Sequence, residues 1–191
     1  MRFLALSFMT LGAVGAFATN LTFHGVADDF FDAYISTDDT VQGTLFASQT
    51  ATWQSGGAGG TVALTSGVDN YLHVRARDVF GAPSMFIATA SLSDSAFKFA
   101  NQTQQINTNA TDWQLSLTGF GQNYFAPTDL GKNGTLVWGN LVLVDSNARH
   151  LWSQQTSGEH YFSLKIESVP EPLTLLALPA LLVLRRKKKS I

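Results

Sequence analysis

The 191-residue chain contains no cysteine, which limits the ways in which it can be stabilised. Neither a disulfide framework nor a thiolate metal site can form, even in a compartment where disulfides persist. Stability must therefore come from packing, with a bound ion as the other available source.

Positive charge is scarce in the body of the chain. Arg2 and residues 185–189 supply half of the twelve Lys and Arg residues. Residues 19–168 keep six Lys/Arg against thirteen Asp/Glu, a net charge of about −7. Nucleic-acid phosphates are bound by clustered cations, so no nucleic-acid partner is expected. With about 150 residues, this body is long enough for one domain with its own core.

Motifs of common enzymes are also absent. His24, His73, His150 and His160 show no zinc-binding spacing and are expected to be unrelated surface or interface residues. No Gly-x-Ser-x-Gly elbow is present. The glycine-rich residues 56–60 lack the Lys-Ser/Thr of a phosphate loop and predict a flexible hairpin loop. We therefore expect a non-enzymatic protein. A secreted hydrolase, the enzymatic alternative, would need two carboxylates in a pocket or a nucleophile–base pair within hydrogen-bond reach.

The first apolar stretch is typical of a secretory signal peptide. Met1-Arg2 forms a short positive region, residues 3–17 are apolar and small, and Ala16-Phe17-Ala18 fits the small-x-small cleavage pattern. The pattern predicts a signal-peptide helix over residues 1–18, cut before Thr19. A first transmembrane helix is the alternative.

A second apolar stretch lies near the other end. Pro170 and Pro172 fix φ and remove two backbone donors, which predicts an extended entry segment. Residues 173–184 carry no charge and predict a short transmembrane helix. At roughly 18 Å it is shorter than the membrane core of about 30 Å, so a short buried helix is the alternative. Five cations follow and stay cytoplasmic by the positive-inside rule: Arg185, Arg186, Lys187, Lys188 and Lys189. Both ends thus place the body outside the cytoplasm.

The Val169-Pro170-Glu171-Pro172 motif, the apolar run and the basic end together resemble the carboxy-terminal sorting signal of the PEP-CTERM proteins of Gram-negative bacteria. The resemblance implies that residues 169–191 are a temporary inner-membrane anchor recognised by exosortase, a membrane cysteine peptidase. It implies cleavage near the motif and release of the body to the cell surface or the extracellular biofilm matrix. The resemblance indicates where the protein is sent and not what activity it has.

The body, residues 19–168, alternates between apolar and polar residues with period two. Leu72, Val74 and Ala76 alternate with polar partners, and residues 113–117 and 162–166 repeat the pattern. Further candidate strands, separated by clusters of turn residues, are 21–26, 29–35, 41–46, 61–64, 85–90 and 141–144. Many short strands without a convincing long helix predict an all-β fold, an antiparallel β-sandwich or jelly roll.

Residues 27–35 resemble the strand with an Asp-Asp pair in galactose-binding-like jelly-roll modules, although residues 36–40 replace the hairpin that often follows it there. The alternative function is therefore a carbohydrate-binding module for exopolysaccharide. Tyr71, Tyr124 and Tyr161 are expected to point outward or lie in a loop, and they are the candidates for stacking on sugar rings.

Carboxylates are densest around residues 28–39. Calcium takes six to eight oxygen ligands, often from loops. With residues 29–35 as a strand, Asp28, Asp29, Asp38 and Asp39 would flank a structural calcium site. Asp is also common in turns, which is the alternative role. The leading interpretation is an exported, non-enzymatic envelope or matrix protein.

Overall fold

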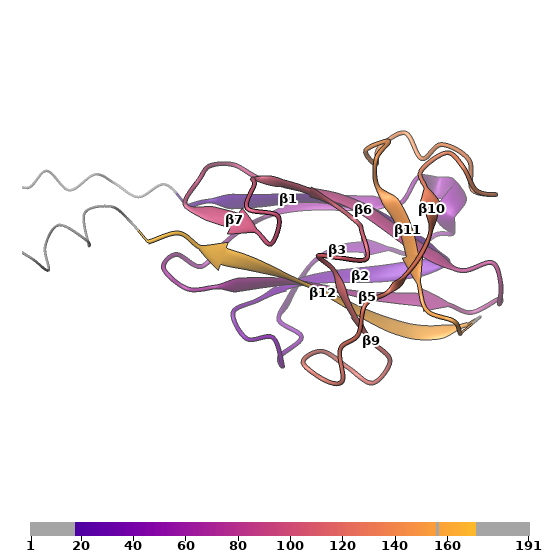
Figure 1. Ribbon diagram of the computed structural model, residues 1–191, viewed down its shortest axis with the longest axis horizontal. Helices are drawn as coiled ribbons and strands as arrows, with labels where there is room; N and C mark the ends of the chain where they lie inside the picture. The colour runs from indigo at the N-terminus through magenta and orange to yellow at the C-terminus, as the bar shows by residue number, and fades with distance from the viewer. Residues whose placement is uncertain (1–17, 156, 171–191) are drawn as a thin grey trace, which may run out of the picture.

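The computed structural model describes residues 18–155 and 157–170, and Figure 1 shows them as two antiparallel sheets packed face to face. Several predicted features lie outside the described residues: Ala16 and the rest of the signal peptide before Ala18, Glu171, Pro172, the apolar run 173–184 and the basic residues 185–189. In the described part of the chain, no helix is long and apolar enough to cross a membrane.

The first sheet is built around the pairing of the first strand with the sixth. Its strands are β1 (Asn20–Asp28), β4 (Ala58–Ala63), β6 (Met85–Leu92), β8 (Gln105–Asn107), β10 (Thr128–Lys132) and β11 (Arg149–Trp152). Their order is β10-β11-β6-β1-β4, and β8 also pairs with β6. Leu21 lies opposite Leu92, and Asp28 lies opposite Met85.

The second sheet is built around the last strand. Its strands are β2 (Phe30–Ser36), β3 (Thr44–Gln49), β5 (Asn70–Asp78), β7 (Phe97–Phe99), β9 (Gln114–Ser116) and β12 (Gly158–Ser168). Their order is β3-β2-β5-β12-β7, and β9 also pairs with β12. A short 3-10 turn, η1 (Trp53–Ser55), precedes β4. The predicted all-β, antiparallel sandwich is confirmed, while the sequence did not indicate β7, β8, β10 or β11.

The main core follows from the period-two alternation. Val74 lies opposite Phe162 and Leu72 opposite Leu164, and all four side chains are buried. Phe86 of the first sheet contacts this layer, with ring centroids 4.8 Å from Phe162. Inward-facing residues of both sheets therefore form one interior, as in other sandwiches.

A smaller apolar cluster covers the outer face of the first sheet. Its members are Val26, Met85, Ile87, Trp138, Leu141, Val144 and Ala148. The prediction of a strand over residues 141–144 was wrong, because this segment forms turns. The Asn133 side-chain amide donates to the carbonyls of Leu141 and Val144, which bends the chain over the sheet. Leu141 and Val144 are buried, whereas Val142 is 82% exposed.

The glycine-rich segment is only partly a loop. Gly56 and Gly57 have positive φ and form the turn, but residues 58–60 already belong to β4. A Cβ atom added at Gly60 would lie 2.7 Å from the carbonyl oxygen of Phe46. Glycine is required there because another backbone passes too close for a side chain.

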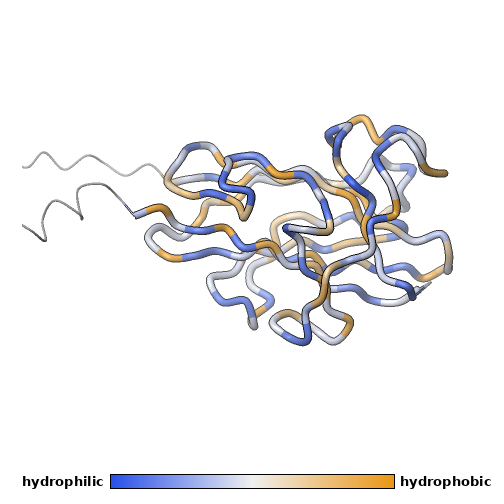
Figure 2. The backbone as a smooth tube through the Cα atoms, viewed as in Figure 1, coloured by the Kyte–Doolittle hydropathy of each residue, from blue (hydrophilic) through white to orange (hydrophobic). Residues whose placement is uncertain are grey.

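Both ends of the described domain lie side by side (Figure 1). The Thr19 hydroxyl donates to Asp94 (2.7 Å), and the Val169 amide donates to the carbonyl of Ala96 (2.8 Å). We call the end of the sandwich that holds Thr19, residues 93–96 and Val169 the terminal end. Residues 79–84, between β5 and β6, and residues 136–138, between β10 and β11, lie at the opposite, distal end, where Figure 2 also shows apolar segments.

The two-sheet core predicts a contrast between two phenylalanines. Phe162→Ala should lower the free energy of unfolding by about 3–5 kcal/mol, because it opens a cavity in the core. Phe80→Ala, at a side chain that is 81% exposed, should change it by less than about 0.5 kcal/mol. Urea denaturation followed by circular dichroism measures both, and equal effects would contradict the assigned core.

Candidate functional site

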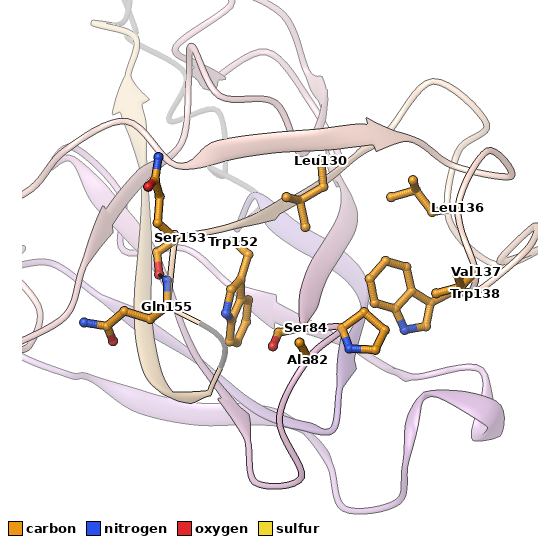
Figure 3. A pocket seen from close by; sticks show the side chains of 11 residues that line it. Ala82, Ser84, Leu130, Leu136, Val137, Trp138, Trp152, Ser153 and Gln155 are labelled. Carbon is orange, nitrogen blue, oxygen red and sulfur yellow. Dashed lines mark hydrogen bonds between the residues drawn. The ribbon is translucent and has the colours of Figure 1, made fainter.

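An apolar pocket of about 360 Å³ lies at the distal end (Figure 3). Three segments that are far apart in the sequence form its walls: the residues before β6, the chain around β10 and its following loop, and the residues after β11. The lining residues are Ala82, Pro83, Ser84, Leu130, Leu136, Val137, Trp138, Trp152, Ser153, Gln154 and Gln155. Apolar walls with a few polar groups are typical of small-molecule sites.

Two tryptophans line this pocket, and each indole ring stacks on a buried histidine. Trp138 Nε1 donates to Asp28 Oδ2 at 2.8 Å, and the ring stacks on His150 with centroids 5.3 Å apart. Trp152, the last residue of β11, stacks on His160 at 3.9 Å. Both indoles are buried apart from the surface that they present to the pocket. These contacts therefore fix the positions of both indole rings at the pocket wall.

The polar groups of the pocket lie mainly along one edge. Ser153, Gln154 and Gln155 follow β11 and form this edge. Among the described residues that line the pocket, none carries a formal charge. Trp152 Nε1 is buried without a hydrogen-bond partner in the described part of the chain.

Three carboxylates, those of Asp28, Asp29 and Asp78, lie next to the pocket. Asp28 bonds to Trp138, and the other two bond to the loop before β6. Asp29 accepts a hydrogen bond from the Val79 amide, and Asp78 accepts from the Phe80 amide and the Ser84 hydroxyl. Burial raises the pKa of Asp28 to about 6. The hydrogen bond from Trp138 opposes this rise, and the neighbouring Asp29 and Asp78 carboxylates add to it.

The expectation that the histidines are unrelated surface or interface residues was wrong for three of the four, because their side chains are buried. His73, His150 and His160 are fully buried, and each packs flat on an aromatic ring, Phe120, Trp138 and Trp152 respectively. Burial lowers the pKa of all three and brings that of His160 to about 4. Spacing along the sequence holds no signal for these contacts, because every stacking partner except Trp152 is at least ten residues away.

A nucleophile–base pair does reach hydrogen-bond distance at the pocket. The Ser153 hydroxyl lies 2.6 Å from His160 Nε2. However, burial lowers the pKa of His160 to about 4, far from the neutral range in which a general base works best. Among the described residues, no carboxylate bonds to His160 Nδ1 to orient the ring. The pair has the distance of a catalytic dyad but neither its basicity nor its orienting group.

The structure does not bring the four candidate calcium ligands together. Asp28 and Asp29 precede β2, whereas Asp38 and Asp39 follow it, so the seven residues of the strand separate the pairs by roughly 20 Å. Among the described residues, no group of three or more His, Asp or Glu side chains is arranged to hold a metal ion. Asp38 instead accepts from the Thr40 amide at 2.8 Å, as turn aspartates do.

Asp39 is the centre of a hydrogen-bond cluster on the outer face of the second sheet. Its Oδ1 accepts from Ser163 Oγ (2.8 Å), Tyr124 OH (3.0 Å) and His73 Nε2 (3.2 Å). These bonds fasten the loops that contain Asp39 and Tyr124 to β5 and β12. Burial raises the pKa of Tyr124 to about 12.

The three candidate sugar-stacking tyrosines meet around this same cluster. Tyr71 lies 6.1 Å from His73, and Tyr161 lies 5.2 Å from Phe120, measured between ring centroids. Each tyrosine is half-buried, and the Tyr124 hydroxyl is already bonded. Phe120, which the sequence pattern did not single out, lies between His73, on which it stacks, and Tyr161.

A second concave surface, of about 990 Å³, lies on the first sheet around β6 and β8. Uncharged polar side chains dominate it, and Asp145 is the one charged residue among the described residues that line it. The amide and hydroxyl residues are Thr89, Ser91, Asn101, Thr103, Gln104, Gln105, Asn107, Thr108, Asn109 and Asn147. We call this surface the polar groove.

Comparison of the chain with protein-family models, with curated proteins and with solved structures gave no match in any of the three.

The raised pKa of Asp28 predicts that Asp28→Asn stabilises the fold, by an amount that depends on pH. The folded chain binds this proton below about pH 6, whereas the unfolded chain binds it only near the ordinary value of 3.8. The charged carboxylate therefore destabilises the fold above about pH 6, and the cost disappears as the pH falls towards 4. Asp28→Asn should raise the free energy of unfolding at pH 7.5, with a gain that vanishes near pH 4.

Urea denaturation at a series of pH values measures this difference, and the buried histidines contribute equally to both proteins. Asp38→Asn is the control, and it should lower the free energy of unfolding at pH 7.5. Hydrogen bonds from Thr40 lower the pKa of Asp38, so its charged form stabilises the fold. A gain for Asp28→Asn that is the same at every pH would contradict the buried carboxylate.

Proposed function

We propose that the chain is an exported, non-enzymatic protein of the bacterial envelope or extracellular matrix, whose sandwich acts by binding. In this proposal a signal peptide, residues 1–18, starts export, and the sorting signal, residues 169–191, anchors the precursor for an exosortase-type peptidase. One observation carries the proposal: Thr19 and Val169 leave the sandwich side by side at the terminal end, opposite the pocket.

Both proposed cleavage regions flank the folded unit. Ala18 is exposed, whereas Thr19 is 3% exposed and bonded to Asp94. At the other end β12 stops at Ser168, directly before the Val169-Pro170-Glu171-Pro172 motif. All twelve strands of the described residues lie between these two points. Cutting at both would therefore remove none of these strands and leave the described core intact.

The proposed anchor would set the orientation of the sandwich relative to the membrane. The apolar run and the five cations would hold the terminal end near the inner membrane, and the prolines would present an extended segment to the peptidase. A tether at the terminal end leaves the distal pocket pointing away from the membrane. Binding is favoured over catalysis because burial makes His160 a weak base and no carboxylate of the described residues orients its ring as in a triad.

A carbohydrate-binding role is the second candidate, and the polar groove favours it. Neutral sugars are bound by arrays of amide and hydroxyl groups, and the groove supplies such groups with little charge. The resemblance of residues 27–35 to galactose-binding-like jelly rolls supports the same role. In this case exopolysaccharide would lie across β6 and β8.

Delivery is tested by the mass of the mature protein. In a host with an exosortase-type peptidase, the accumulated protein should lack the residues after the Pro-Glu-Pro region, and in a host without it the tail should remain. Replacing Pro170, Glu171 and Pro172 together by Ala keeps the apolar run and the cations, so this variant should stay uncut in both hosts. A tail that stays intact in both hosts with the native motif counts against the proposal.

Carbohydrate binding is tested by retardation in polysaccharide gels. Retention should fall several-fold for Gln105→Ala, in the polar groove, but not for Gln122→Ala, which is also exposed and does not line the groove. The absence of retention with every polysaccharide, with and without calcium, would exclude this second candidate.

A further inference from the structure

The walls of the distal pocket indicate what kind of ligand it can take. Pro83, Leu130, Leu136, Trp138 and Trp152 present carbon surface to about 360 Å³ of space. This volume is at the lower end of the range of roughly 300–1,000 Å³ for small-molecule sites. The indole rings are fixed by Asp28, His150 and His160, so little ordering is needed when a ligand enters.

The electrostatics of the pocket favour an uncharged ligand. None of the described lining residues carries a charge that could pair with a ligand ion. The carboxylates behind the wall, Asp28, Asp29 and Asp78, are already bonded to Trp138 and to the loop before β6. An anion would be repelled by them, and a cation would lose water without gaining a direct partner.

The polar edge adds a requirement for an acceptor. Trp152 Nε1 is buried without a partner among the described residues. In Figure 3 the nitrogen-bearing edge of Trp152 faces the side of Ser153 and Gln155. A buried N–H without an acceptor has lost its hydrogen bond to water, so a ligand oxygen at this edge would add to affinity.

The mouth of the pocket is apolar as well. Val137 lines the pocket, and its side chain is 75% exposed. An exposed apolar side chain beside a concave site commonly marks a binding surface.

We propose that the distal pocket binds a neutral small amphiphile, with an apolar ring or branched aliphatic body against the two tryptophans. Its single uncharged oxygen acceptor, a carbonyl, ether or hydroxyl group, lies towards Ser153, Gln155 and Trp152. This inference deepens the proposed binding role of the sandwich, on which it rests, and it is independent of export and processing.

The charge requirement is tested with two fluorescent probes that share one skeleton. N-phenyl-1-naphthylamine is neutral, and 8-anilinonaphthalene-1-sulfonate is the same molecule with an added sulfonate. The purified full chain should bind the neutral probe at least tenfold more tightly. Val137→Asp should weaken that binding at least tenfold, whereas Val142→Asp, in the same loop but outside the pocket, should not.

Both variants alter exposed side chains and keep both apolar ends of the chain, so probe bound to those ends contributes equally. Circular dichroism and urea denaturation verify that each variant is folded. Equal binding of the two probes, or equal loss in the two variants, would overturn the assignment of the pocket.

The acceptor requirement is tested by competition against the neutral probe. 2-Acetylnaphthalene should displace it several-fold better than 2-ethylnaphthalene, and Trp152→Phe, which keeps a ring but removes the N–H, should abolish this preference. Equal displacement by the two compounds in the native protein would overturn the acceptor at Trp152.

A third compound separates this proposal from the proposed function. 2-Naphthyl acetate should bind and remain uncleaved. Hydrolysis that Ser153→Ala abolishes would overturn the non-enzymatic role and leave the pocket assignment standing, whereas failure of the neutral probe to bind would overturn the pocket and leave delivery untouched.

Discussion

The structure depends on the packing of β12 against the rest of the second sheet. This last strand pairs with β5, β7 and β9, and its Phe162 and Leu164 lie in the main core opposite Val74 and Leu72 of β5. Phe162 also contacts Phe86 of the first sheet, so β12 connects both layers. Removing water from these facing side chains is the main source of stability in a chain without cysteine.

Loops cover much of the outer face of each sheet, and buried histidines form part of both coverings. On the first sheet His150 lies under Trp138, and on the second His73 lies under Phe120 and bonds to Asp39. A neutral imidazole combines a flat surface for stacking with one donor and one acceptor, so it fits between a sheet and a loop. The two coverings have different surfaces: apolar around the distal pocket, and partly aromatic around Asp39.

Sequence reasoning succeeded where the signal was local. Strict alternation identified β5 and β12, because one face of each strand is buried in the core. It failed for residues 141–144, which bend around the Asn133 side chain, and for Gly59 and Gly60, whose place in β4 depends on the close approach of β1 and Phe46. The pocket could not be predicted from the sequence, because its lining residues lie between positions 82 and 155 in three separate segments. The pairing of β6 with β11 brings two of these segments together. Asp28 and Asp39 are near in sequence but are held apart by an extended strand.

The late position of β12 in the sequence has a consequence for a chain that is proposed to be exported through a membrane. Until residues 158–168 emerge, β5 has only β2 as a neighbour, and β7 and β9 lack the strand with which they pair. Premature folding would therefore be unfavourable while translocation is still pulling on the chain. The sandwich is complete only after β12, which directly precedes the proline motif, has crossed the membrane. Under the proposed export, the domain would therefore finish folding at about the time when the proposed cleavage motif reaches the outer side.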